Sequence, residues 1–366
     1  MDRSRNIIRV SFIGIAANVV LAAFKAVVGI ITGSIAIVLD AVNNLSDAFS
    51  SIVTIVGTKI ASKPPDKKHP YGHGRVEYIS AIVIAIIVIL AGVTAFREAV
   101  SSILHPEAAN YTVASLLIIA AAVLVKFFLG RYVKHAGETY RSESLVASGT
   151  DASFDALVSL STLVAALVSM IFHISIEGWL GVVIAVLIIK AGAEILLDSL
   201  SSIIGARVEG ETTTALREKI NSYPDVKGTY DLILNRYGPE RTIGSVHIEV
   251  PDQMTAREIH HLTRKMAEDV YNEFGIVLTV GIYAANDSDP AYEAIRKEVE
   301  ETVARHEGVL GIHGFYVDPS AERVTFDLLM EFGADWQKVY QEVKEDLSAA
   351  HPEYRFDIVL DSDISD

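Results

Sequence analysis

The sequence contains no cysteine. Disulfide bonds and thiolate metal ligands are therefore excluded, and any bound metal must be held by oxygen or nitrogen atoms. The sequence also has no Gly-rich phosphate loop, no nucleophile elbow and no H-E-x-x-H zinc motif, so it does not predict an enzyme. Positive charge is scarce as well: 31 basic residues stand against 46 acidic ones, whereas nucleic-acid binding requires a basic surface. We expect no nucleic acid among the partners.

Charge and hydropathy divide the chain near residue 206. Residues 207–366 hold 32 acidic and 16 basic residues, a net charge of −16. This leaves 14 acidic and 15 basic residues, a net charge of +1, for residues 1–206. The first part is nearly neutral and strongly apolar, and the second part is acidic and polar. We therefore expect a lipid-embedded part followed by a tail in water.

Long apolar stretches are confined to the first part. A bilayer core requires about 20 apolar residues per helix. Six segments qualify: 8–31, 35–60, 78–103, 111–133, 146–172 and 177–203. They predict an α-helical membrane protein with six transmembrane helices, the first of which is a retained span rather than a signal peptide.

Lysine and arginine are missing from alternate connections between these spans. The connections around Thr32-Gly33, HPEAANYT and HISIEG contain neither residue. Basic residues instead precede the first span and lie between spans two and three and between spans four and five. By the positive-inside rule, both termini are cytoplasmic. We expect a multi-pass protein of the plasma membrane, embedded in the lipid bilayer.

The tail repeats one pattern of short helices and strands. From residue 212 the periodicity predicts a helix, two strands, a helix and a strand, and the same order returns from residue 294. This order is typical of a ferredoxin-like module, with a small antiparallel sheet and helices on one face. We therefore expect a membrane domain over residues 1–206 and a cytoplasmic α+β tail of two ferredoxin-like modules, over residues 207–286 and 291–366.

Two of the spans carry polar side chains that are out of place in lipid. The stretch DAVNNLSD in the second span contains Asn43 and Asp47, and DASFD in the fifth contains Asp151 and Asp155. Residues four apart share one face of a helix, so each span presents two oxygen-bearing side chains in line. Carboxylates in a bilayer must be neutralised. If the two faces meet, the four side chains can surround a divalent cation or take up protons. A water-filled cavity without a ligand is the alternative interpretation.

Together these features resemble the cation diffusion facilitator family of proton-coupled divalent metal exporters. The resemblance rests on the six spans, the elements DAVNNLSD and DASFDALVS, the loop HPYGHGRVEYISA and the ferredoxin-like tail. It implies a homodimer that exchanges H⁺ for a divalent metal ion by alternating access, with no cofactor besides the transported ion. It also implies that the transport site consists of Asn43, Asp47, Asp151 and Asp155.

The four transport-site positions contain no histidine, unlike those of the family's zinc transporters. Carboxylate and carboxamide oxygens suit Mn²⁺, whereas imidazole favours the later metals, and the all-oxygen set is similar to the family's manganese branch. We therefore predict Mn²⁺ as the cargo. The exchanged protons would sit on Asp47, Asp151 and Asp155, because Asn43 cannot titrate. A Zn²⁺, Fe²⁺ or Cd²⁺ exporter of the same family, and a membrane-anchored metal sensor without transport, are the alternatives.

Histidines outside the spans suggest two further metal sites. Asp66, His69 and His73 in PPDKKHPYGHGR resemble the family's loop-borne metal site. The alternative is a polar loop whose histidines bond to backbone. In the tail, His247 and His260 match positions at which family members bind regulatory metal at the dimer interface, although the third histidine usual there is missing.

The second module offers fewer metal ligands at the matching positions. Phe326 is expected to occupy the place that His247 has in the first module. We therefore predict that the second module is a structural or dimer-shaping copy.

Overall fold

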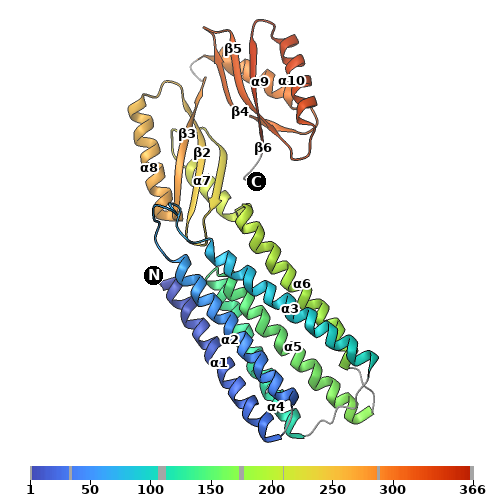
Figure 1. The fold of residues 1–366 in the computed structure, drawn as a ribbon. Coiled ribbons are helices and arrows are strands. Elements are labelled where there is room, and N and C mark those ends of the chain that lie inside the picture. The colour runs from blue at the N-terminus through green and yellow to red at the C-terminus, as the bar shows by residue number, and fades with distance from the viewer. Residues whose placement is uncertain are drawn as a thin grey trace. The chain divides into compact units, whose positions relative to one another are not determined.

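A computed structural model of the chain describes residues 2–32, 35–105, 113–172, 177–208, 210–286 and 289–362. In parts of some helices only the backbone is described, and residues 35–43 are one such stretch. The chain divides into two compact units (Figure 1). The first consists of Met1–Ala206 with Tyr237–Glu240, and the second of Arg207–Arg236 with Arg241–Asp366.

The first unit is built from six long helices, which coincide with the six predicted spans. They are α1 (Asp2–Thr32), α2 (Ile35–Ala61), α3 (Val76–Leu104), α4 (Val113–Thr139), α5 (Glu143–Phe172) and α6 (Glu177–Ile204). The most extensive packing pairs α1 with α2, α3 with α6 and α4 with α5, and α2 also packs against α5. The prediction of a helical N-terminal part is confirmed.

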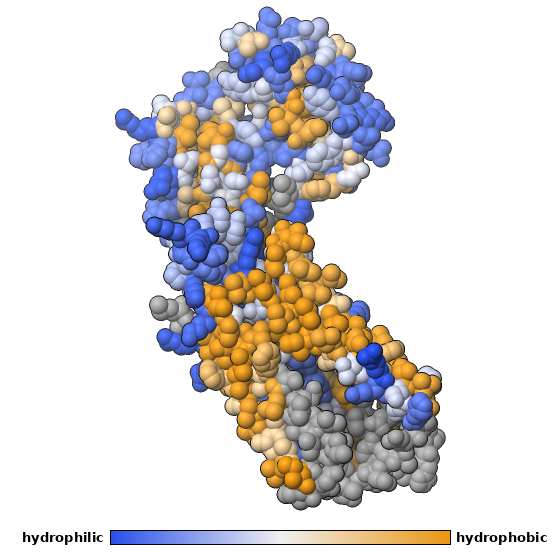
Figure 2. Space-filling view, viewed as in Figure 1, coloured by the Kyte–Doolittle hydropathy of each residue, from blue (hydrophilic) through white to orange (hydrophobic). Residues whose placement is uncertain are grey.

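Apolar side chains cover much of the described surface of this helical unit (Figure 2). Phe12, Leu90 and Phe128 are 59%, 60% and 66% exposed, which suits contact with lipid rather than water. Within the described residues, three stretches are long and apolar enough to cross a membrane: Arg3–Val27, Val76–Leu104 and Gly178–Ile204. The other three long helices, α2, α4 and α5, carry most of the polar side chains considered below.

Glycine allows α4 and α5 to approach each other closely. A Cβ atom at Gly130 of α4 would lie 2.8 Å from the backbone nitrogen of Ser153 in α5, so any larger residue would force the helices apart. Gly137 makes a similar approach, with Val146 N 2.6 Å from its Cβ position. The close contact of α4 with α5 places the helical turn of α4 that precedes Gly130 beside the middle of α5.

One end of the helical unit is joined by a buried ion pair. Arg3 of α1 donates to both carboxylate oxygens of Glu77 in α3 at 3.0 Å, and the Glu77 side chain is fully buried. Arg3 Nε also donates to the carbonyl of Tyr140, 2.6 Å away, just after α4. Removing the Arg3 guanidinium would leave the buried Glu77 carboxylate without this charge partner, which is strongly destabilising.

The second unit contains the same order of elements twice. The first module has α7 (Gly210–Asn221), β1 (Gly228–Arg236), β2 (Thr242–Pro251), α8 (Ala256–Phe274) and β3 (Ile276–Ala285). The second has α9 (Pro290–Val303), β4 (Val309–Asp318), β5 (Arg323–Met330), α10 (Trp336–Ala350) and β6 (Arg355–Ser362). The predicted α+β tail of two repeated modules is confirmed.

Each module contains a three-stranded sheet of mixed direction. The strand orders are β1-β2-β3 and β4-β5-β6, with the first two strands antiparallel and the last two parallel. The prediction of wholly antiparallel sheets was therefore wrong. Helices α8 and α10 return the chain to the starting end of the preceding strand, so β3 and β6 must run parallel to β2 and β5.

The helices of each module cover one face of its sheet. In the first module, Val246 and Ile248 of β2 are buried with Met266 and Val270 of α8. In the second, Phe326 of β5 is part of the corresponding core. Because side chains alternate along a strand, the residues between these core positions point to the opposite face.

The strand registers show which residues of the two modules correspond. Tyr230 pairs with His247 across β1 and β2, and His313 pairs with Asp327 across β4 and β5. In each module this pair comes just before an irregularity in the first strand of the sheet, which is β1 in the first module and β4 in the second. The residue in position 327, not Phe326, therefore occupies the place of His247, and that part of the prediction was wrong. The side chain of Phe326 points into the core of the second module, so the side chain of its neighbour Asp327 points to the opposite face of the sheet.

Candidate metal centre

Three of the four predicted transport-site residues come together inside the helical unit. Asp47 of α2 and Asp151 of α5 are each 8% exposed, and the side chain of Asp155 is 22% exposed. The side chain of Asn43 lies outside the described residues, although α2 continues through that position. The geometry thus brings the carboxylates of two helices to one place.

A lysine that the sequence interpretation passed over lies between these carboxylates. Lys126 of α4 is 2% exposed. Its Nζ donates to Oδ2 of Asp155 at 2.9 Å and also to Oδ2 of Asp47. Three helices therefore converge on one buried cation. The signal in the sequence was a single lysine in the apolar stretch AAAVLVKFFLG, which resembles any lysine whose stem lies in lipid.

The charges at this centre do not balance. With all groups ionised, three carboxylates face one ammonium, which leaves two negative charges in a largely buried site. Buried charges of this kind must be paired or neutralised. The centre therefore has room for further positive charge, as protons or as a metal ion. Carboxylate oxygens are the ligands that Mg²⁺, Ca²⁺ and Mn²⁺ prefer.

Buried hydroxyl groups continue from this centre along α2 and α5. Thr54 Oγ1 is fully buried and lies 3.4 Å from the carbonyl of Ser144 and 3.5 Å from Ser148 Oγ, so the two helices meet at polar atoms. The hydroxyl-bearing residues buried on these two helices include Ser50, Ser51, Thr54, Thr58, Ser144 and Ser148. They lie between the carboxylates and the end of the helical unit that the charge pattern predicts to be cytoplasmic.

The predicted loop residues Asp66, His69 and His73 also come together. Asp66 Oδ1 lies 3.4 Å from His69 Nδ1, and its Oδ2 lies 3.5 Å from His73 Nε2. Asp66 also accepts hydrogen bonds from the backbone of His69 and Lys68, and these lower the pKa of its carboxyl. A metal ion could be held by the three side chains, whose ligand atoms lie within 4.8 Å of one another.

The two predicted tail histidines do not come together within one chain. His247 alternates with the core residues of β2, so it points away from α8, whereas His260 is an exposed residue of α8. The sheet therefore separates them. His247 Nδ1 instead lies 2.6 Å from Asp231 Oδ2, in a cluster that also includes residues of the second module.

Comparison with protein families agrees with this architecture. The model of the cation efflux transmembrane domain matches residues 11–204, and that of the cation efflux cytoplasmic domain matches residues 208–282. The chain belongs to the cation efflux family, which consists of transporters rather than enzymes. Residues 283–366, which include the second module, lie outside both matches.

Individual relatives include bacterial and archaeal transporters. The chain is 27% identical over 267 residues to the manganese efflux system protein MneS of Bacillus subtilis, covering 73% of this chain and 91% of the relative. It is 25% identical over 285 residues to MneP of the same organism, covering 75% and 94%. It is also 28% identical over 250 residues to the uncharacterized transporter MJ0449 of Methanocaldococcus jannaschii, covering 68% and 88%.

Proposed function

We propose that this protein exports divalent metal cations, Mn²⁺ above all, from the cytoplasm in exchange for protons by alternating access. The observation that carries the proposal is the convergence of Asp47, Asp151 and Asp155 on one buried cation in the helical unit. A helix that only anchored a tail would not require carboxylates at such a position. Asn43 would complete the transport site as a neutral oxygen ligand.

Two observations favour Mn²⁺ among the divalent metals. The charged ligands are carboxylates only. Mn²⁺ binds most weakly of the divalent first-row metals, and a site without imidazole lowers the affinity of its later competitors more than that of Mn²⁺. Two relatives carry the name of manganese efflux systems. A Zn²⁺, Fe²⁺ or Cd²⁺ cargo would be the alternative within the same mechanism.

Lys126 would act as a resident counter-ion in the metal-free state. Its ammonium bonds to one oxygen of each of two carboxylates that a metal ion would need, and the two positive charges would repel each other, so lysine and metal ion compete for the site. An arriving metal ion must displace the ammonium together with any protons on the carboxylates. On release of the metal, Lys126 can return and limit the exposed negative charge. The buried hydroxyls between α2 and α5 would line the route from the cytoplasm.

Transport by purified protein in vesicles tests this proposal. With an imposed pH gradient, the wild type should accumulate Mn²⁺, and Asp151→Asn should reduce the initial rate about 100-fold or more, because a carboxylate that binds both metal and proton is lost. Asp198→Asn is the matched control, since Asp198 is an exposed carboxylate of α6. Unchanged efflux in Asp151→Asn would favour a membrane-anchored metal sensor instead.

The loop cluster would form an accessory metal site. His73→Gln should remove one bound Mn²⁺ per chain from the purified protein, because a carboxylate with one imidazole is too few ligands, while vesicle transport continues. Metal content after gel filtration measures the loss, and His135→Gln, at an exposed histidine of α4, is the control. An unchanged metal content in His73→Gln would show that Asp66, His69 and His73 only shape the loop.

The protein would act as a homodimer in the plasma membrane, with both termini in the cytoplasm. A family match named for the cytoplasmic dimerisation domain supports the dimer, and the distribution of lysine and arginine supports the orientation. Because the chain has no cysteine, single introduced cysteines and impermeant thiol reagents would report the side of each connection without background.

A further inference from the structure

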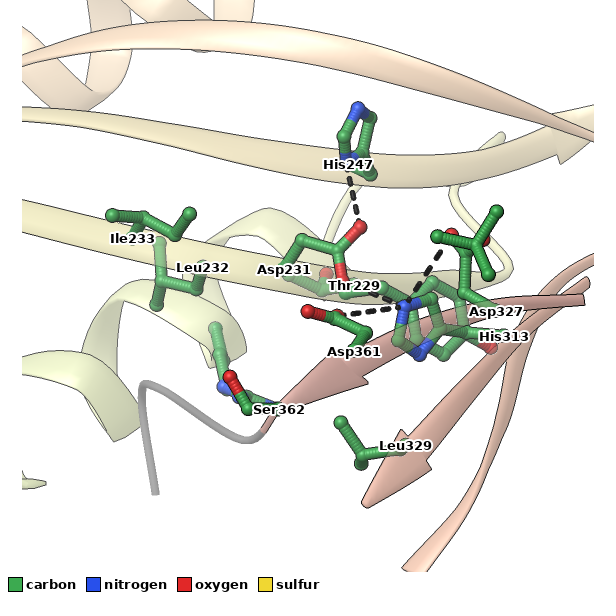
Figure 3. A pocket seen from close by; sticks show the side chains of 13 residues that line it. Thr229, Asp231, Leu232, Ile233, His247, His313, Asp327, Leu329, Asp361 and Ser362 are labelled. Carbon is green, nitrogen blue, oxygen red and sulfur yellow. Dashed lines mark hydrogen bonds and ion pairs between the residues drawn. The ribbon is translucent and has the colours of Figure 1, made fainter. Parts of the chain in front are cut away.

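A pocket of about 320 Å³ lies where the two modules of the second unit meet. Residues of β1 and β2 line one side of it, and residues of β4, β5 and β6 line the other (Figure 3). Its lining includes Asp231, His247, His313, Asp327 and Asp361. The sequence pattern had singled out only His247, and the second module lies outside both family matches.

One histidine stands at the centre of three carboxylates in this pocket. Nε2 of His313 lies 2.7 Å from Asp231 Oδ1, 3.3 Å from Asp361 Oδ2 and 3.7 Å from Asp327 Oδ2. His313 is 4% exposed, and neither its Nε2 nor Asp231 Oδ1 makes a hydrogen bond of acceptable geometry within the described residues. Figure 3 shows the ring of His313 directed at the carboxylates. A buried ligand atom thus points at a cluster of negative charge.

Few side-chain hydrogen atoms among the described residues reach the carboxylate oxygens of this cluster, and one of them is on the ring of His247, whose Nδ1 lies 2.6 Å from Asp231 Oδ2. The hydroxyl of Tyr283 lies 2.6 Å from Asp231 Oδ2 and 2.6 Å from Asp327 Oδ2, yet it has only one hydrogen to donate. His313 Nε2 likewise can offer one hydrogen to three carboxylates. A bound cation would interact with the carboxylate oxygens that the single hydrogen atoms of Tyr283 and His313 leave without a donor.

The two modules contribute unequal residues at corresponding positions. By strand register, His313 corresponds to Tyr230 and Asp327 to His247, while Asp361 corresponds to Tyr283. The second module therefore supplies three ligand side chains, and the first supplies Asp231, which lies in the irregular part of β1 at φ 51°. The ring of Tyr230 stacks on His313 with centroids 5.3 Å apart and holds its orientation.

We propose that Asp231, His313, Asp327 and Asp361 bind a divalent transition-metal cation and so join the two modules of one chain. The three carboxylates can more than neutralise the two positive charges of a divalent ion, and the imidazole favours a transition metal over Mg²⁺ or Ca²⁺. Because the ligands come from both modules, metal binding stabilises the contact between the two modules. The site is separate from the transport centre, and it stands whether or not Mn²⁺ is the transported ion.

Hydrogen exchange of the full-length protein in detergent, with and without MnCl₂, tests this proposal. Mn²⁺ should slow exchange in β1 and β4 of the wild type and of Asp151→Asn, since the transport centre is not involved. In His313→Gln and in Asp361→Asn, the Mn²⁺ concentration required for this protection should rise about tenfold or more. The Asp361 side chain is 31% exposed, so its substitution keeps the test valid if His313→Gln fails to fold.

His351→Gln is the matched control. His351 is a 9% exposed histidine of the second module with carboxylates of Glu298 and Glu353 at 3.1 Å and 3.5 Å, but it lies outside the pocket. The His351→Gln variant should show the same Mn²⁺-dependent slowing of hydrogen exchange as the wild type. Absence of Mn²⁺-dependent protection in the wild type would overturn the proposal and show a metal-free contact of ion pairs. Protection of Asp361→Asn at the wild-type Mn²⁺ concentration would also overturn it, because the ion would then bind through other ligands. Neither result would alter the expected vesicle transport, so the two proposals fail independently.

Discussion

Replacing Lys126 with glutamine should tighten Mn²⁺ binding at the transport centre by about tenfold or more and slow transport. The ammonium competes with the metal for oxygens of Asp47 and Asp155, so metal binding in the wild type must also separate a buried ion pair. In Lys126→Gln, Mn²⁺ competes only with protons for the carboxylates. Release should become slower, because no internal cation then returns to neutralise the carboxylates. Equilibrium Mn²⁺ binding and initial rates in vesicles, both at one fixed pH, measure the two effects.

The same variant should show a characteristic pattern of thermal stability. In the absence of metal, Lys126→Gln should unfold at a lower temperature than the wild type, because the carboxylates lose their partner. Saturating Mn²⁺ should raise its melting temperature more than that of the wild type, since tighter binding stabilises the folded state further. Lys190→Gln is the control, because Lys190 is 71% exposed in α6 and pairs at the surface with Glu194. Weaker Mn²⁺ binding in Lys126→Gln would instead make the lysine a structural support of the site.

Replacing Asn43 with histidine should move the metal preference from Mn²⁺ toward Zn²⁺. An imidazole nitrogen strengthens binding of the later divalent metals much more than that of Mn²⁺. We expect the ratio of Zn²⁺ to Mn²⁺ transport to rise about tenfold, which corresponds to about 1.4 kcal/mol of differential binding free energy. Competition between the two metals in vesicles gives this ratio directly.

The position of the new imidazole is decisive in this experiment. Asn44→His places the same group on the next residue, about 100° further around the helix, and Asn44 is a 1% exposed residue. A comparable change of preference in Asn44→His, or an unchanged preference in Asn43→His, would contradict the assignment of Asn43 to the transport site. Thermal unfolding of both variants shows whether packing alone has changed.

The sequence predicted the elements of this fold well because hydrophobic periodicity is a local property. Six apolar stretches became six helices, and the repeated order of helices and strands became two modules. The direction of β3 and β6 was missed, since the order of elements alone does not say to which end of the sheet a connecting helix returns the chain. The chain actually returns through α8 and α10 and makes both strands parallel to their neighbours.

The candidate sites were predictable where polar residues recur at helical spacing within an apolar span or lie together in a short loop. Asp47, Asp151 and Asp155 were found from helical spacing, and Asp66, His69 and His73 from a short loop. Lys126 was missed because its role depends on the close contact of α4 with α5, which a single span does not reveal. The cluster around His313 gathers residues from four strands, and the sequence interpretation was also wrong by one residue in the strand register, with Phe326 in place of Asp327.

We propose that the carboxylates around Lys126 carry a divalent cation across the membrane. The most direct test is Mn²⁺ uptake into vesicles of purified protein under an imposed pH gradient, with wild type and Asp151→Asn side by side. The expected result is Mn²⁺ accumulation by the wild type that reverses when the pH gradient is reversed, and no accumulation above empty vesicles for Asp151→Asn. Equal uptake by the two proteins would contradict the claim.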